Sequence, residues 1–257
     1  MNPPGFELAI VAVLGLLIGS FLNAVIHRVP RKQSLVSPGS RCPSCGYALL
    51  WYDNIPVVSY LILGGRCRKC RKTISIRYPI VELITAAVFV AHYFVFGWTP
   101  LLAVRLAFAA SLVALFAIDL EHHLLPDVIT LPGIVVGLVA SLFLPPGIAE
   151  SLIGILIGGG VLWVIGEAYF RYAGEEGMGG GDVKMLAMIG AFLGWKLVLV
   201  TLVLSSVAGS VLGLAIIVVK RGGMKYALPF GTFLALGALA ASLIGAQIVT
   251  WYAGHLG

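Results

Sequence analysis

Four cysteines form the first group of residues in this sequence whose type and spacing could do chemistry. They occur as two C-x-x-C pairs, Cys42-Pro-Ser-Cys45 and Cys67-Arg-Lys-Cys70, with 21 residues between the pairs. This spacing is typical of a tetrahedral zinc site, in which each pair supplies two thiolates. Neighbouring arginine and lysine side chains favour the thiolate form. We therefore expect a structural zinc ion, because four protein ligands leave no open position for catalysis.

Two aspartates form the second group. Asp119 ends one apolar stretch, and Asp182 follows Gly179-Gly180-Gly181 and begins another. A carboxylate at the edge of the hydrocarbon is costly and is a functional candidate by default. If the two carboxylates approach each other, they cannot both ionise easily and will share a proton. Such a pair can hydrolyse a peptide: the ionised carboxylate activates a water, and its protonated partner donates to the oxyanion or leaving amine. The glycines would let the backbone bend and let an extended substrate approach.

Each acid in this region also has a structural interpretation. Asp127 begins an apolar stretch, so helix N-capping is its expected role. Glu175 and Glu176 fit a solvated turn, where they could attract a basic substrate segment. Asp182 could itself cap a helix, and Asp119 could be an interfacial residue. The chemistry of the residues alone leaves these alternatives open.

The composition predicts that these residues belong to a membrane protein. Sixty per cent of the 257 residues are apolar and 11% are charged, and the mean hydropathy is +1.02. Soluble domains carry about 25% charged residues, so lipid must be the solvent for most of this chain. We expect an all-α integral membrane protein with about eight transmembrane helices. The apolar stretches are Phe6–Ile26, Ile80–Val95, Leu101–Ile118, Val128–Leu144, Ile148–Tyr169, Val183–Leu193, Leu197–Val219 and Phe230–Tyr252.

The distribution of charge predicts the orientation in the membrane. Ten lysines and arginines lie between Arg28 and Arg77, against one acid, Asp53. By the positive-inside rule, this loop is cytosolic and the N-terminus faces outward. Counting spans from the loop puts Asp119 and Asp182 at the cytosolic edge. The formal net charge of +6 then reflects topology, so we expect no nucleic-acid partner. A reducing cytosol also argues against two disulfides among the cysteines.

Two regions follow from this organisation. Residues 1–78 hold the first span and the cytosolic four-cysteine loop, and residues 79–257 hold the remaining closely spaced spans. Within a span, small residues let helices pack closely. This is the expected role of Gly158-Gly159-Gly160.

Several longer motifs give the chain a family resemblance. It resembles the type IV prepilin peptidases, the bifunctional prepilin leader peptidase/N-methyltransferases, over essentially its whole length. The matching stretches in the first half are Gly19-Ser-Phe-Leu-Asn23-Ala-Val-Ile-His-Arg28-Val-Pro30, both C-x-x-C pairs, Trp51-Tyr-Asp-Asn54-Ile-Pro56 and Arg77-Tyr-Pro-Ile-Val-Glu82. Those in the second half are Ile118-Asp119-Leu-Glu121, Leu125-Pro-Asp127, Thr130-Leu-Pro132 and Gly179-Gly-Gly-Asp182-Val-Lys184, which fits the family's GxGD motif.

The resemblance implies a membrane aspartyl endopeptidase with Asp119 and Asp182 as the catalytic carboxylates. Such an enzyme removes the basic leader of type IV prepilins and pseudopilins at the cytosolic face of the bacterial inner membrane. It typically cuts after a glycine, and it usually methylates the new N-terminal residue with S-adenosylmethionine. The implied partners are these substrates, the lipid bilayer and a pilus or type II secretion machinery.

The resemblance gives the methyl-transfer function less support at the level of residues. It associates methyl transfer with residues 1–78 but does not identify a methyl-donor site, for which Glu82 and Arg28 are only candidates. Gly179, Gly181 and Lys184, with Glu175, Glu176 and Asp127, are candidates for substrate binding or for support of the catalytic pair. The family commonly has a second proline where Thr232 stands, and we expect this difference to alter the local helix start more than the chemistry.

Two other classes of protein remain as alternatives. In a transporter, the acids at the membrane edge would bind ions or protons, and Gly179–Gly181 would mark a broken helix. Against this, no inverted repeat is evident, and the acids lie at one face instead of the midplane. In a non-enzymatic zinc scaffold of a secretion system, Asp119 and Asp182 could be lost without consequence.

Overall fold

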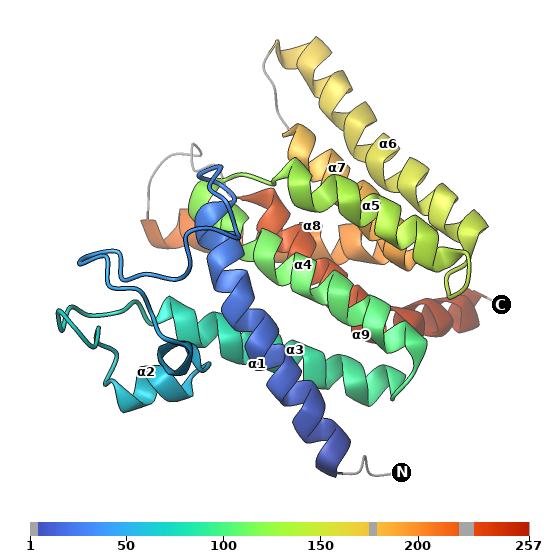
Figure 1. Cartoon of the computed structure of the whole chain (residues 1–257). Helices are drawn as coiled ribbons and strands as arrows, with labels where there is room; N and C mark the ends of the chain where they lie inside the picture. The colour runs from blue at the N-terminus through green and yellow to red at the C-terminus, as the bar shows by residue number, and fades with distance from the viewer. Residues whose placement is uncertain (1–4, 175–178, 221–228, 257) are drawn as a thin grey trace. The chain divides into compact units, whose positions relative to one another are not determined.

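The computed structural model describes residues 5–174, 179–220 and 229–256. Helices dominate this part of the chain, and its β structure consists of two isolated bridges, Arg41–Ala48 and Arg66–Thr73. A chain in hydrocarbon has to satisfy its backbone hydrogen bonds internally, which helices do within one segment. The all-α prediction is confirmed. The chain divides into two compact units, Met1–Leu102 and Ala103–Gly257, and Figure 1 shows their elements.

Each of the eight predicted apolar stretches corresponds to a helix among the described residues, but only six of these helices are long and apolar enough to cross a membrane. The six are α1 (Gly5–Arg28), α3 (Arg77–Phe96), α4 (Pro100–His122), α6 (Ile148–Ala173), α8 (Trp195–Lys220) and α9 (Phe230–Leu256). The other two, α5 (Asp127–Ser141) and α7 (Gly180–Leu193), have 15 and 14 residues. A span needs roughly 17–25 residues, so these two are shorter than a typical span. The protein is therefore a multi-pass membrane protein, and six long spans are compatible with the prediction of about eight.

The first unit is organised by a close crossing of α1 and α3. A Cβ added to Gly15 would lie 2.5 Å from Ala86 Cα, and one added to Gly19 would lie 2.6 Å from Glu82 Cα. Glycines four residues apart allow this approach, as in small-residue packing motifs of membrane helices. The loop between the two helices contains a short 3-10 helix, η1 (Trp51–Asn54), and α2 (Val58–Ile62). The unit extends beyond the predicted boundary at residue 78 and includes α3.

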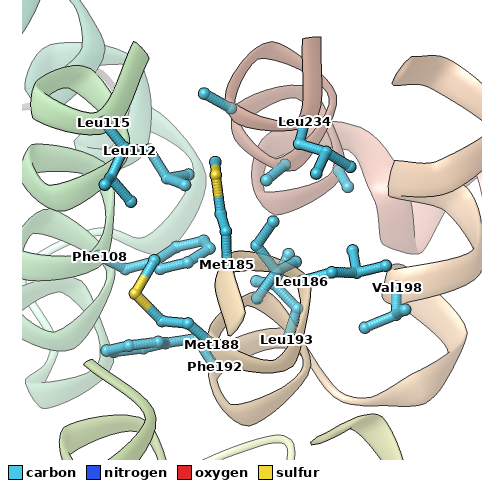
Figure 2. Close-up of a cluster of buried hydrophobic side chains, with 14 of the residues drawn as sticks. Phe108, Leu112, Leu115, Met185, Leu186, Met188, Phe192, Leu193, Val198 and Leu234 are labelled. Carbon is cyan, nitrogen blue, oxygen red and sulfur yellow. The ribbon is translucent and has the colours of Figure 1, made fainter. Parts of the chain in front are cut away.

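The second unit is built around α7. Every residue from Met185 to Leu193 is buried, and a helix that is apolar all round is buried by protein. Figure 2 shows the α7 side chains surrounded by Phe108 of α4, Val198 of α8 and Leu234 of α9. The short α7 is therefore a central core helix, and its N-terminal end carries Asp182.

Glycines also set the packing of α6 against α7, which lie side by side in Figure 1. A Cβ on Gly158 would lie 2.6 Å from the carbonyl oxygen of Leu186, and one on Gly154 would lie 2.5 Å from that of Gly190. The packing role predicted for Gly158 is confirmed. Gly160 differs, because a Cβ there would meet nothing within 4 Å.

Candidate active site

The fold brings Asp119 and Asp182 together around the side chain of Leu125. A Cβ on Gly181 would lie 2.9 Å from Leu125 Cβ, and one on Gly231 would lie 2.8 Å from Leu125 Cδ1 and 2.9 Å from Asp119 Oδ2. Asp182 follows Gly181 directly. The C-terminal end of α4 and the N-terminal ends of α7 and α9 therefore meet at one place. Cβ atoms at Gly181 and Gly231 would not fit there without displacing these neighbours.

The carboxylate of Asp119 is fixed by the first turn of α9. Its side chain is buried, and Oδ2 accepts hydrogen bonds from the Thr232 backbone N–H at 2.7 Å and the Thr232 hydroxyl at 3.0 Å. The first N–H groups of a helix have no intrahelical acceptor, and the helix dipole is positive there. These two donors hold Oδ2 at the start of α9. The Thr232 side chain thus contacts the candidate site directly, and the expectation that this difference mainly alters a helix start stays a prediction.

Asp182 occupies a different environment, in the first turn of its own helix. The N-cap of α7 is Gly179, and no side chain caps that end, so the structure does not support Asp182 as the cap. The residue is half-buried and lies outside the six helices that could span the membrane. Burial, together with the nearby negative charge of Asp119, raises the pKa of Asp182 to about 6. A raised pKa of one carboxyl is expected where two acids lie close enough to share a proton.

Asp127 and Lys184 form an ion pair beside this site. Lys184 Nζ lies 2.8 Å from both oxygens of the Asp127 carboxylate, and both side chains are exposed. The N-cap of α5 is Pro126, and no side-chain capping bond is present there. The N-capping role expected for Asp127 was therefore wrong, and the carboxylate instead ties the start of α5 to the first turns of α7. Glu175 and Glu176 lie outside the described residues.

The four cysteines form a compact cluster, as their spacing predicted. Their Sγ atoms all lie within 4.8 Å of one another, and the Cys42–Cys70 and Cys45–Cys67 distances are 3.8 and 3.9 Å. A disulfide requires about 2.05 Å, and all four cysteines are free. Four thiolates placed tetrahedrally about 2.3 Å from one ion would be about 3.8 Å apart. The cluster therefore fits a metal ion with four thiolate ligands.

The two cysteine pairs have the same local backbone structure. The Cys42 N–H donates to the Tyr47 carbonyl at 2.8 Å, and the Cys67 N–H donates to the Lys72 carbonyl at 2.9 Å. The residue after the second cysteine of each pair takes a positive φ, +69° at Gly46 and +59° at Arg71. Glycine adopts this conformation readily and arginine does not. The second turn is therefore the more strained of the two.

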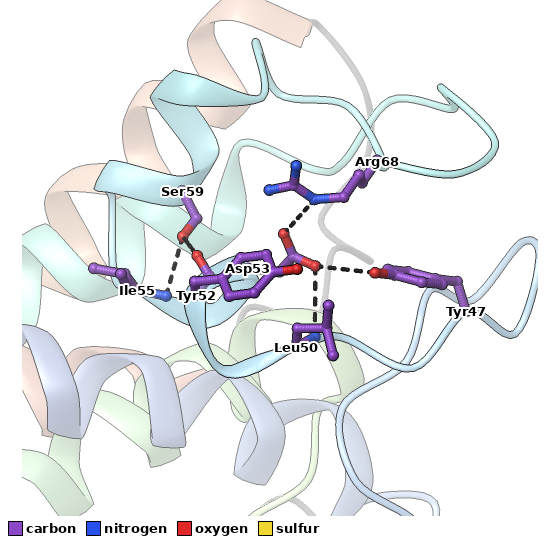
Figure 3. A network of polar contacts seen from close by, with 7 residues as sticks. All are labelled: Tyr47, Leu50, Tyr52, Asp53, Ile55, Ser59 and Arg68. Carbon is purple, nitrogen blue, oxygen red and sulfur yellow. Dashed lines mark hydrogen bonds and ion pairs between the residues drawn. The ribbon is translucent and has the colours of Figure 1, made fainter.

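Asp53 links the two cysteine turns, and sequence reasoning did not identify this role. Its side chain is 1% exposed, and Oδ1 accepts a hydrogen bond from Arg68 Nε at 2.7 Å. Oδ2 accepts from the Leu50 N–H at 3.4 Å and the Tyr47 hydroxyl at 3.5 Å. Figure 3 shows these bonds converging on the carboxylate. Tyr47 belongs to the first turn and Arg68 to the second, so one buried acid connects both. Its isolation among ten basic residues was the available signal.

Comparison with known proteins places this arrangement in a family. Residues 13–96 match the Bacterial Peptidase A24 N-terminal domain, and residues 106–214 match the Type IV leader peptidase family. A prepilin leader peptidase/N-methyltransferase of Pseudomonas aeruginosa is 39% identical to the chain, with 98% of this chain and 94% of the relative covered. The chain belongs to the type IV leader peptidase family.

Other members of the type IV leader peptidase family align equally fully. The prepilin leader peptidase/N-methyltransferase of Aeromonas salmonicida is 39% identical, with 97% of this chain and 94% of the relative covered. That of Burkholderia pseudomallei is 37% identical, with 95% and 87% covered. No solved structure gives a significant match. The resemblance noted in the sequence motifs is confirmed, and it extends over both compact units.

Proposed function

We propose that this member of the type IV leader peptidase family is a membrane aspartyl endopeptidase. It removes the basic leader from type IV prepilins or pseudopilins and methylates the amine of the new N-terminal residue. The observation that carries the peptidase assignment is the approach of Asp119 and Asp182, two acids 63 positions apart in the sequence, at the ends of α4 and α7. The names of the relatives support both activities.

The different surroundings of the two acids support a division of roles. Asp119 Oδ2 is held by the two Thr232 donors, so Asp119 is the base that takes a proton from the attacking water. Asp182, whose pKa is raised to about 6, carries the proton that passes to the leaving amine as the peptide C–N bond breaks. The oxygen of the water adds to the carbonyl carbon before the C–N bond breaks. Each cleavage consumes one water, and in it Asp119 gains one proton while Asp182 loses one.

Two bound groups complete the proposal. A zinc ion is the proposed occupant of the four-cysteine cluster, where thiolate ligands suit it and a closed site gives it a structural role. S-adenosylmethionine is the proposed methyl donor and, when bound, supplies the methyl group. The methyl-transfer function is assigned to residues 1–78, which include α1 and the cysteine loop.

The location and partners follow from the same proposal. The excess of basic residues in the α1–α3 loop supports a cytosolic position for this loop, and with it an active site at the cytosolic face of the bacterial inner membrane. The apolar part of the substrate would stay in the bilayer while its basic leader meets the acidic residues near the site. A pilus or type II secretion machinery would receive the processed substrate.

The test is cleavage of a prepilin with a basic leader, in detergent or vesicles. The variants Asp119→Asn and Asp182→Asn are compared with Asp127→Asn, a matched control whose acid lies on a neighbouring helix end and pairs with Lys184. Insertion and metal content are checked for each. We expect the first two to lose cleavage by at least about 10²-fold and the control to keep most of it. Full cleavage by both pair variants would refute the aspartyl mechanism.

A further inference from the structure

A second group of buried polar side chains lies at the crossing of α1 and α3, within the first unit. Asn23 of α1 is 2% exposed and Glu82 of α3 is 6% exposed. Gly19 packs against Glu82 and lies one turn before Asn23, while Tyr78 lies one turn before Glu82. An Asn23–Tyr78 hydrogen bond of 3.0 Å crosses the same interface. Asn23 and Glu82 are therefore neighbours at one helix crossing.

The orientation of the Asn23 amide is fixed by its donors. Nδ2 donates to the carbonyl oxygens of Gly19 at 3.3 Å and Tyr78 at 3.0 Å. A flipped amide would point its oxygen at these two acceptors, so the assignment is unambiguous on chemical grounds. Within the described chain, Oδ1 is buried and accepts no hydrogen bond. A buried carbonyl oxygen without a donor is destabilising and is an exception in a native interior.

Glu82 is a buried carboxylate that does not occur among the ion pairs found within the described residues. Its Oε2 accepts a hydrogen bond from the Val57 N–H at 2.8 Å. Acids at such positions pair with an opposite charge in most proteins. Within the described part of the chain, the crossing therefore offers a carboxylate and a free acceptor to a cationic donor.

The segment that covers Glu82 is held in a strained conformation. Val57 has φ +60°, a conformation that is rare and strained for a β-branched residue. Its N–H is the backbone donor on Glu82, so it occupies a position that another N–H donor could take. Strained residues of this kind cluster at ligand clamps. A ligand ammonium that displaces the Val57 N–H would release this strain.

We propose that Asn23 and Glu82 bind the primary ammonium group at the N-terminus of a newly cleaved substrate. The ammonium would donate to Glu82 and to Asn23 Oδ1, which supplies the missing cation and the missing donor together. This inference rests on the proposed function, because leader removal creates an α-amine and the methyl-transfer reaction acts on that amine. The crossing belongs to α1 and α3, in the part of the chain that matches the N-terminal domain of the family.

The experiment measures binding without methyl transfer. A synthetic peptide with the sequence of a mature pilin N-terminus is compared with the same peptide acetylated at its N-terminus, using the full-length protein in detergent without a methyl donor. The wild type should bind the free amine at least about tenfold more tightly, as expected for charge-assisted hydrogen bonds. Equal affinity for the two peptides would overturn the proposal without any mutation.

Variants then test which residues cause the preference for the free-amine peptide. Glu82→Gln keeps an acceptor for the Val57 N–H but removes the charge, so the amine preference should fall to about twofold or less while affinity for the acetylated peptide stays. Asn23→Ala should reduce the preference in part. Glu7→Gln is the matched control, a carboxylate on α1 that accepts from Tyr93, and it should keep the wild-type preference. Full preference in Glu82→Gln would overturn the proposal.

Two further arms separate the competing explanations. If Glu82→Gln weakens binding of S-adenosylmethionine alone and leaves the peptide preference intact, the site serves the donor's amino group and the proposal is wrong. The peptides are supplied already cleaved, so the measurement does not depend on Asp119 or Asp182. A wild type that fails to cut prepilin but prefers the free amine would refute the proposed peptidase and support the ammonium site.

Discussion

Replacing Asp182 with asparagine is expected to stabilise the protein at neutral pH even though it abolishes cleavage. Burial and the charge of Asp119 raise the pKa of Asp182 from 3.8 to about 6. A raised carboxyl pKa means that the folded state disfavours the ionised form, and the cost is 1.36 kcal/mol per pKa unit. The shift of about 2 units corresponds to about 3 kcal/mol. Because the side chain is only half-buried, solvent screening reduces this to about 1–2 kcal/mol.

The free-energy cost of ionising Asp182 in the folded protein depends on pH. Below pH 4 the carboxyl is protonated in both the folded and the unfolded state, so the cost is absent. The cost develops as pH rises from about 4 to about 6 and is complete above that range. Asparagine cannot ionise and removes it. The advantage of Asp182→Asn over wild type should therefore be greatest at pH 7.5 and about half as large at pH 5.

The assay is thermal unfolding of the purified protein in detergent at one fixed scan rate, because membrane proteins often unfold irreversibly. At pH 7.5 the apparent Tm of Asp182→Asn should exceed that of wild type by about 2–8 °C. Asp127→Asn is the control, since loss of its exposed ion pair should cost no more than about 1 kcal/mol. An unchanged or lower Tm for Asp182→Asn, or a gain equal at pH 5 and 7.5, would refute the reasoning.

Three other predictions concern the hydroxyl bond of Thr232, the backbone at Arg71 and the acids Glu175 and Glu176. Thr232→Val removes the hydroxyl bond to Asp119 but keeps the N–H bond, so kcat for prepilin cleavage should fall about tenfold with KM within about twofold; an unchanged kcat would contradict the positioning role. Arg71→Gly relieves the positive φ of +59° and should slow metal loss to a chelator, with stabilisation of about 1 kcal/mol; faster loss would mean that the arginine side chain has a role of its own. The double variant Glu175→Gln/Glu176→Gln should weaken cleavage of a basic leader and reduce its salt dependence, measured as KM at low and high salt; if neither changes, these acids do not bind the leader.

The sequence by itself determined the class of the protein and the four-cysteine loop. Membrane insertion depends on the length and composition of apolar stretches, which are local properties of the chain. The cysteine cluster was also predictable from the sequence, because each C-x-x-C turn fixes two sulfurs within a few residues and the two pairs can then bind one ion. The apolar stretches of α5 and α7 were recognised as well, and these helices are shorter than a typical span.

Only the tertiary structure decided which residues the acids contact. The bonds from Thr232 to Asp119 join residues 113 positions apart, and the Lys184–Asp127 pair joins residues 57 positions apart. The ties from Tyr47 and Arg68 to Asp53, and the place of Glu82 beside Asn23, likewise depend on packing between segments. The periodicity of the sequence indicates which face of a helix is apolar, but it does not indicate which other helix that face will contact. That choice is made by close contacts between helices, such as those at Gly19 and Gly154, because helices that pack this tightly fix which polar side chains lie opposite one another.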